Sequence, residues 1–327
     1  MVTVLVGIVL WFIPEPEGVD PRACHLLAIF VATIVGIITK PLPMGAVAVL
    51  GITVTALTGT LTIGQSLSGF GNSVIWLIVI AFFISRGFIK TGLGARIAYL
   101  FMAVVGKTSL GLAYSMVATD LVLAPAIPSN TARSGGILFP ILKSIAQSYG
   151  SEPDDGTARK IGAFLIQTSF QGTVITSAMF LTAMAANPLA AQIARDLGVE
   201  ISWGGWALAA LVPGLVSLGM MPWILYKIYP PEIKETPAAT QIARGELARM
   251  GKLKPSEWFM LGTFLLLLIL WILGGELGLH STTAAFVGLA ALLVSGTLTW
   301  SDILQEKGAW NTVGVVLSFG DDGELSE

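Results

Sequence analysis

Thr58-Gly59-Thr60-Leu61-Thr62 and Ser295-Gly296-Thr297-Leu298-Thr299 are two copies of one short stretch, placed 237 residues apart in the chain. Each copy follows an apolar run, and each is followed, five residues after its last threonine, by a leucine. A proline and another apolar run precede each copy. Repetition within an apolar chain is typical of secondary transporters that are built from internal repeats.

The composition indicates a membrane protein. Of the 327 residues, 54% are hydrophobic and 12% are charged, and the mean hydropathy is +0.80. A soluble domain carries about 25% charged residues. Because backbone groups in lipid must be satisfied within their own segment, the sequence predicts an all-α polytopic membrane protein. The net charge of −2 argues against nucleic acid as a partner, and no Walker A, H-E-x-x-H or G-x-S-x-G motif supports an enzyme.

A membrane span needs about 20 apolar residues. Apolar runs bounded by glycine and proline predict spans near 1–13, 24–39, 44–57, 72–88, 161–185, 206–228, 258–273 and 282–294.

The segment 108–148 differs from these spans. Two short apolar arms, 110–123 and 137–145, flank a centre that contains Pro125, Pro128 and a pair of glycines. Prolines and glycines interrupt helices, and non-helical backbone at membrane depth survives only against protein or water. We therefore predict a re-entrant hairpin, with 124–132 non-helical, within the membrane thickness and reached from the cytoplasmic side.

The distribution of basic residues sets the predicted topology. With the N-terminus in the cytoplasm and an even number of crossings in the hairpin, all but three of the 18 Lys and Arg residues face the cytoplasm. Such a bias follows the positive-inside rule. The two copies of the repeated stretch then leave the membrane on opposite sides, so the repeats are predicted to be inverted.

The predicted organisation has five parts. An N-terminal span (1–17) precedes a first inverted repeat (18–228), which holds the hairpin, and a cytoplasmic linker (229–252) leads to a second repeat (253–319). The second repeat is incomplete, because no second hairpin follows it, and an acidic tail occupies 320–327. We expect a C-terminally truncated chain that carries half of a substrate site and is inactive by itself.

Ser129-Asn130-Thr131 lies at the predicted hairpin tip. Its hydroxyl and amide oxygens suit Na⁺, and the backbone N–H groups of the following helix suit a carboxylate. The alternative is an ordinary helix cap, since Ser, Asn and Thr are common capping residues.

Ser-Asn-Thr at such a hairpin resembles the signature of the divalent anion:sodium symporter family. The flanking Ala118-Thr119-Asp120-Leu121 and Pro125-Ala126-Ile127-Pro128, with Leu10-Trp11-Phe12-Ile13-Pro14 and Lys40-Pro41-Leu42-Pro43-Met44, resemble its 2-oxoglutarate/malate translocator branch. The resemblance runs from the N-terminus to about Asn311. It implies an elevator-type transporter of di- and tricarboxylates that forms a homodimer when complete, here in a bacterial inner membrane.

The resemblance also implies site residues. A substrate carboxylate is expected at Ser129, Asn130, Thr131, Thr182 and Asn187, and a sodium ion at Ser129, Asn130 and Ala183. The matching loop 182–188 lacks the Gly-Ser-Pro-Pro-Asn pattern of sodium-coupled members, so sodium symport and anion exchange both stay open. Na⁺ is the one cofactor considered, and an inorganic-anion (sulfate) permease of the same fold is the alternative function.

Asp120 and Arg133 are charged residues in the predicted hairpin, where an ionisable side chain is a functional candidate. If the two side chains pair, their role is structural. If Arg133 is free, its guanidinium can hold a substrate carboxylate with two hydrogen bonds. Thr173, Thr176 and Ser177 add polar side chains to the next span, with interhelical hydrogen bonding as the simplest reading.

Overall fold

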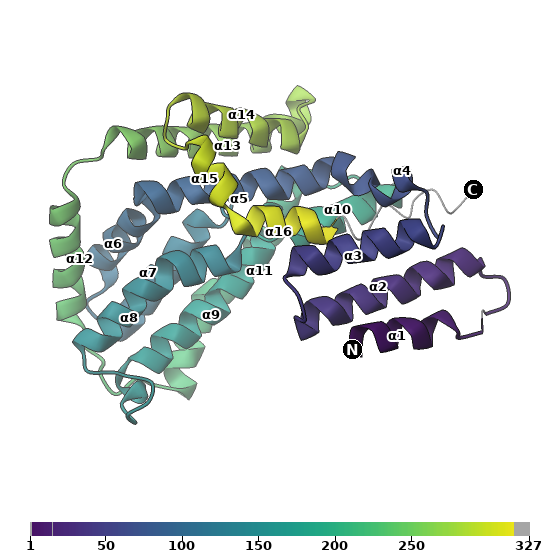
Figure 1. The fold of residues 1–327 in the computed structure, drawn as a ribbon. Helices are drawn as coiled ribbons and strands as arrows, with labels where there is room; N and C mark the ends of the chain where they lie inside the picture. The colour runs from purple at the N-terminus through teal and green to yellow at the C-terminus, as the bar shows by residue number, and fades with distance from the viewer. Residues whose placement is uncertain (1, 15, 317–327) are drawn as a thin grey trace. The chain divides into compact units, whose positions relative to one another are not determined.

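A computed structural model describes residues 2–14 and 16–316, with side chains described as far as Val313. Every regular element in these ranges is a helix (Figure 1). The elements are α1 (Val2–Trp11), α2 (Pro21–Thr39), α3 (Met44–Leu57), α4 (Ile63–Ser66), η1 (Ser68–Gly71), α5 (Ser73–Thr91), α6 (Leu93–Val105), α7 (Ser109–Leu123), η2 (Thr131–Leu138), α8 (Phe139–Ser148), η3 (Ala158–Lys160), α9 (Gly162–Met179), α10 (Ala186–Asp196), α11 (Trp203–Ile228), α12 (Pro237–Met250), α13 (Pro255–Leu277), α14 (Ser281–Val294), α15 (Trp300–Gln305) and α16 (Lys307–Val316).

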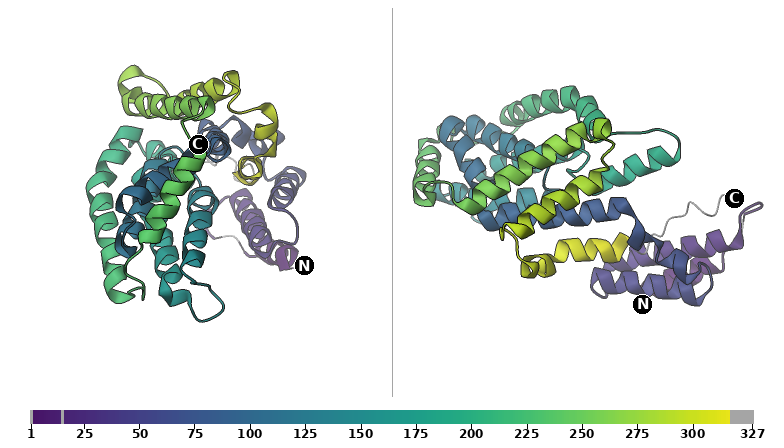
Figure 2. Two further views of the ribbon diagram at one scale, coloured as in Figure 1. Left: turned by 90° about the vertical axis from the view of Figure 1, so that its left-hand side faces the viewer. Right: turned by 90° about the horizontal axis from the view of Figure 1, so that it is seen from above.

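The chain divides into two compact units, and the divisions fall within α5, between Val79 and Ile80, and between α15 and α16, after Gln305. α16 therefore belongs to the first unit, with α1 to α4. In the first unit α2 packs against α1 and α3, and α16 packs against α3. In the second unit α9 packs against α7 and α11, and α13 packs against α14 (Figure 2). Four described helices are long and apolar enough to cross a membrane, namely α2, α5, α11 and α13.

The two copies of the repeated stretch have the same local structure. α3 and α14 each span 14 residues, and each is followed by a glycine in the left-handed region, with φ +67° at Gly59 and +69° at Gly296. A hydroxyl pair brackets each glycine, Thr58 with Thr60 at 2.8 Å and Ser295 with Thr297 at 2.9 Å. The sequence repeat is therefore also a repeat of helix, turn and following helix.

A capping box begins the next helix in both copies. The Thr62 amide donates to Gln65 Oε1 (3.0 Å), and the Thr299 amide donates to Asp302 Oδ2 (2.7 Å). In return each threonine hydroxyl accepts a hydrogen bond from the backbone amide of Gln65 or Asp302. Such reciprocal bonds satisfy amides that a helix start leaves free. The opposite orientation of the two copies in a membrane stays a prediction.

Most predicted spans agree with helices to within four residues at each end, and 44–57 agrees with α3 at both ends. The span predicted at 161–185 is wrong beyond Met179, because Phe180 is extended (φ −129°, ψ 141°) and ends α9. The sequence reading also missed α6. Gly92, with φ +80°, ends α5, and Gly94 and Arg96 then interrupt the apolar pattern of α6.

The predicted linker, 229–252, is part of the second unit. In α12, Ala239 and Ala243 are fully buried beside α6, and the Thr236 amide donates to the Lys107 carbonyl (2.7 Å). Arg96 of α6 reaches the start of α13, where its Nε lies 2.5 Å from Glu257 Oε1. These contacts tie α12 and α13 to α6. The predicted tail at 320–327 lies outside the described residues.

Candidate functional site

Two helix breaks form the candidate site. The first follows α7, where residues 124–129 are non-helical before the chain resumes a helix at Asn130. Pro125 and Pro128 explain the break, because proline lacks an amide donor and disfavours a helical residue before it. The predicted non-helical segment 124–132 is therefore confirmed for 124–129. It is wrong for 130–132, which begin a helix that runs as a π-helix through Leu138.

Ser129 directly precedes the restarted helix. Its Oγ accepts a hydrogen bond from the Ala132 amide (3.2 Å), and its carbonyl accepts one from the Arg133 amide (3.0 Å). This is the capping arrangement that the sequence left open as an alternative. Ser129 and Asn130 are half-buried and Thr131 is exposed, so the start of this helix is partly open.

The second break follows α9. Residues 180–185 are non-helical, and α10 begins at Ala186, so the predicted loop 182–188 is wrong for its last three residues. Asn187, in the first turn of α10, donates from Nδ2 to the carbonyls of Ser177 (2.7 Å) and Phe180 (2.9 Å). These carbonyls belong to the end of α9, where a helix leaves acceptors without partners.

Arg133 joins the two breaks. Its side chain is fully buried, and Nη1 donates both to the Ala183 carbonyl (2.7 Å) and to the Ile127 carbonyl. Ile127 lies in the first break and Ala183 in the second. One side chain thus holds unwound backbone from both segments, supplying donors for carbonyls that no longer belong to a helix.

The rest of the guanidinium is also bonded. Nε lies 3.1 Å from Asp120 Oδ1, and Nη2 lies 2.7 Å from Ser177 Oγ and 3.3 Å from Asn130 Oδ1. The second Asp120 oxygen accepts a hydrogen bond from Thr176. All five guanidinium N–H groups therefore have protein acceptors. The geometry favours the alternative in which Arg133 pairs with Asp120.

The predicted site residues thus fall into three groups. Asn130, Arg133 and the Ala183 carbonyl lie within one hydrogen-bonded cluster. Thr182 is buried, and its hydroxyl donates to the Pro125 carbonyl (2.5 Å). Thr131 is exposed, outside this cluster.

Ser177 belongs to the site although the sequence reading gave it no specific role. Its hydroxyl accepts from Arg133, and its single proton faces two acceptors, Asn130 Oδ1 (2.5 Å) and the Thr173 carbonyl. Arg133 Nη2 also donates to Asn130 Oδ1 (3.3 Å), so the oxygen of the Asn130 amide is turned toward these donors. The three polar residues in one apolar span, Thr173, Thr176 and Ser177, were the feature of the sequence that could have indicated this role. The prediction that they form hydrogen bonds between helical segments is confirmed for Thr173, which accepts from Arg133, and for Thr176, which donates to Asp120. Trp203 donates from Nε1 to Thr182 Oγ1 (3.0 Å), and no feature of the sequence indicated that it belongs to the site.

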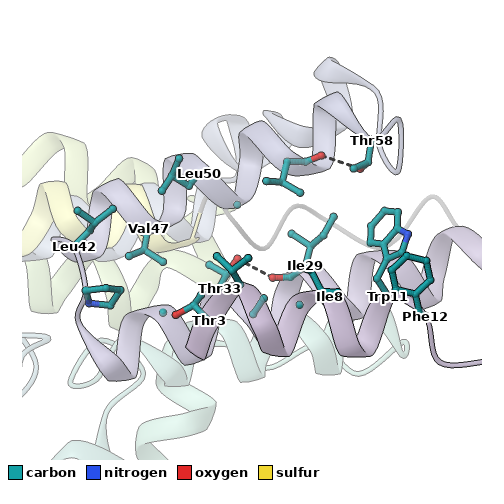
Figure 3. A pocket seen from close by; sticks show the side chains of 17 residues that line it. Thr3, Ile8, Trp11, Phe12, Ile29, Thr33, Leu42, Val47, Leu50 and Thr58 are labelled. Carbon is teal, nitrogen blue, oxygen red and sulfur yellow. Dashed lines mark hydrogen bonds between the residues drawn. The ribbon is translucent and has the colours of Figure 1, made fainter. Parts of the chain in front are cut away.

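A separate apolar groove of about 600 Å³ lies in the first unit, between α1, α2 and α3 (Figure 3). Gly7, Ala32 and Gly36 are among the residues that line it. Trp11 and Phe12 line one end (Figure 3). None of the predicted site residues lines it. Among the described residues, no three His, Cys, Asp or Glu side chains gather as a metal site.

Comparison with known proteins agrees with this architecture. The chain matches the family model described as "Sodium:sulfate symporter transmembrane region" over residues 1–320. It is 62% identical to the "Putative malate transporter YflS" of Bacillus subtilis over 96% of this chain and 66% of that protein. It is 52% identical to the chloroplastic dicarboxylate transporter 1 of Spinacia oleracea (96% and 55%) and 44% identical to the inner membrane protein YbhI of Escherichia coli (93% and 65%).

The helices and these matches together define an integral membrane protein of a transporter family. The chain belongs to the sodium:sulfate symporter family, which is also called the divalent anion:sodium symporter family. It spans 55–66% of the length of the three relatives named above.

Proposed function

We propose that the complete product of the gene encoding this chain is a secondary transporter of dicarboxylates such as malate, 2-oxoglutarate and succinate. The observation that carries the proposal is the pair of helix breaks, 124–129 and 180–185, held together by Arg133. Broken helices at membrane depth are the places where transporters bind polar substrates. Names of relatives, which include malate and dicarboxylate transporters, support a dicarboxylate substrate.

The carboxylate is proposed to bind at the start of the helix that begins with Ser129 and Asn130. Backbone amides and the positive end of the helix dipole face outward there, and both favour an anion. Ser129, Asn130 and Thr131 are the half-buried and exposed residues at this point, so they are the proposed substrate ligands. Thr182, Asn187 and Arg133 have their donors committed to protein acceptors and act as positioning residues in this proposal.

For the coupling mode, the cluster favours exchange of anions over sodium symport. The Ala183 carbonyl and Asn130 Oδ1, two of the oxygens expected to ligate Na⁺, both accept hydrogen bonds from Arg133. Hydrogen bonds from the guanidinium occupy lone pairs on the oxygens that a cation would need as ligands. Sodium symport and sulfate transport are the two alternatives that the experiment must separate.

The test is flux into proteoliposomes that contain the complete gene product. Vesicles preloaded with malate should take up labelled malate and 2-oxoglutarate at rates that do not change when Na⁺ replaces K⁺. Empty vesicles should take up little. No flux of any of these dicarboxylates would refute the proposal, flux that requires Na⁺ and no internal anion would indicate symport, and sulfate that competes fully with malate would favour the sulfate alternative.

We also propose that the complete protein works by elevator-type alternating access and forms a homodimer. It is proposed to lie in a bacterial inner membrane with its N-terminus in the cytoplasm. A homodimer predicts a doubled mass in detergent by light scattering. A cytoplasmic N-terminus predicts that a cysteine at Thr3, introduced after Cys24→Ala, is modified in intact cells only by reagents that cross the membrane.

A further inference from the structure

Trp203 stands at the start of α11 and touches the second helix break in two ways. Its indole N–H donates to Thr182 Oγ1 (3.0 Å), and its ring stacks on Phe180 with 5.8 Å between ring centroids. Only 5% of Trp203 is exposed. Phe180 is the residue at which α9 ends, so one side chain contacts both the beginning and the middle of the non-helical segment 180–185.

The contact continues to the first break through one hydroxyl. Thr182 Oγ1 donates its single proton to the Pro125 carbonyl (2.5 Å), while its oxygen accepts from Trp203. An indole N–H can only donate and a carbonyl can only accept, so the direction of both hydrogen bonds is fixed. The result is a buried chain of two hydrogen bonds from α11 through 180–185 to 124–129.

This chain is a second bridge between the breaks, beside the one made by Arg133. Arg133 donates to the carbonyls of Ile127 in the first break and Ala183 in the second. The hydroxyl of Thr182, in the second break, donates to the carbonyl of Pro125 in the first. The Trp203 ring also stacks on Trp271 of α13, at 5.9 Å between centroids. Trp203 thereby contacts both α13 and the second break, and its indole N–H is committed to Thr182.

We propose that Trp203 is a positioning residue for the anion site. By fixing the Thr182 hydroxyl, it sets the spacing between the two helix breaks and so the place of Asn130 relative to 180–185. The proposal rests on the proposed function for its effect on substrate affinity, and it makes a structural prediction that does not depend on transport.

The structural experiment is hydrogen–deuterium exchange of the purified complete gene product, read in the peptides that cover 124–130 and 180–187. Trp203→Phe keeps the stacked ring and removes the N–H, and Thr182→Val keeps the shape and removes the hydroxyl. Each should speed exchange in both peptides about tenfold, because one buried hydrogen bond of the chain is lost. Thr182→Ser, which keeps a hydroxyl, should restore slow exchange.

Trp271→Phe is the matched control. Trp271 is buried in the same stack, and its N–H donates to the Ser281 carbonyl (3.1 Å) away from both breaks. Removing that N–H should leave both peptides unchanged. Unchanged exchange at 124–130 in Trp203→Phe, or equal effects of Trp203→Phe and Trp271→Phe, would overturn the proposal.

The transport readout separates this proposal from the proposed function. In assays of malate transport into proteoliposomes, Trp203→Phe and Thr182→Val should each raise KM for malate about tenfold with kcat nearly unchanged. The double variant should match the single ones, because both substitutions break the same chain of hydrogen bonds. A lower kcat at unchanged KM would contradict a positioning role. If the unaltered protein transports no dicarboxylate, the proposed function fails. The hydrogen–deuterium exchange result still decides whether Trp203 positions the two breaks.

Discussion

Nη1 of Arg133 lies 2.7 Å from the Ala183 carbonyl oxygen, 50 residues further along the chain, and the same nitrogen donates to the Ile127 carbonyl. One guanidinium therefore spans both helix breaks, and its charge is balanced by Asp120. Because guanidinium is planar and carries five donors, lysine cannot replace it in such a position.

From the ion pair of Arg133 with Asp120 we expect separate effects on stability and on transport. Arg133→Gln leaves the Asp120 carboxylate buried without a counter-charge, which should reduce the free energy of unfolding by about 3 kcal/mol. Adding Asp120→Asn removes that charge and should restore much of the lost stability. Flux should be lost in the single and the double variant, since both lack the bridge between the breaks.

Thermal unfolding in detergent and flux in proteoliposomes measure these two effects on the same preparations. Arg133→Lys serves as the charge-conserving control, and it should keep more stability than Arg133→Gln but still lose flux. Normal flux in the double variant would show that Arg133 serves only to neutralise Asp120.

Asn130→Ala should abolish transport. The Asn130 amide lies at the open start of the restarted helix, with Oδ1 held by Ser177 at 2.5 Å, so its nitrogen is oriented by the protein. Loss of one fixed ligand should lower substrate affinity more than about tenfold. Malate exchange kinetics measure this loss.

Ser115→Ala is a suitable comparison for the Asn130 variant. Ser115 is fully buried in α7, and its hydroxyl donates to the Leu112 carbonyl of its own helix (2.7 Å), so removal of that hydroxyl should leave KM unchanged. Near-normal kinetics in Asn130→Ala would reduce Asn130 to a residue of the helix start.

The sequence predicted those features that depend on local chemistry. Helix α3 was bounded correctly because Pro43 precedes it and Gly59 follows it. The break at 124–129 followed from two prolines. Helix α6 was missed because Gly94 and Arg96 interrupt a short apolar run, and its buried residues are explained only by packing against α7 and α12.

The site network depended on tertiary structure. The sequence left open whether Arg133 pairs with Asp120, since both outcomes suit the same residues at the same spacing. The acceptors that decide it, Ala183 and Ser177, lie 50 and 44 residues away and become neighbours only when α9 packs on α7. Trp203 was unpredictable for the same reason, because an aromatic residue near a span end usually belongs to the membrane interface.

Asp302 predicts an acid-sensitive contribution to stability. Burial raises the pKa of this carboxyl, but hydrogen bonds from Lys90 and from the Thr299 hydroxyl and amide, with the Lys90 charge, outweigh it and lower the pKa from 3.8 to about 2. A depressed pKa stabilises the folded state above the unfolded pKa, and this stabilisation is lost as the pH falls through the folded pKa.

We therefore expect Asp302→Asn to lower the free energy of unfolding by about 1 kcal/mol at pH 7, a modest value because the Lys90 side chain is partly exposed. The difference from the unaltered protein should shrink between pH 4 and pH 2, the window set by the two pKa values. Thermal unfolding against pH measures it, with the exposed Asp154→Asn as a control that should show no such change. A difference that grows on acidification would contradict this account of Asp302.

The last prediction concerns the side from which the first break is reached. Non-helical backbone is tolerated at membrane depth when protein groups satisfy it, and here Thr182 and Arg133 bond the carbonyls of Pro125 and Ile127. After Cys24→Ala, which removes the single cysteine, Ser129→Cys should react with a permeant maleimide, or with an impermeant one applied from the cytoplasmic side. Ser202→Cys, predicted to lie outside, should react with the impermeant reagent in intact cells, and Lys252→Cys in the predicted cytoplasmic linker should not. Fast labelling of Ser129→Cys from outside in every condition would mean that 108–148 forms two ordinary spans.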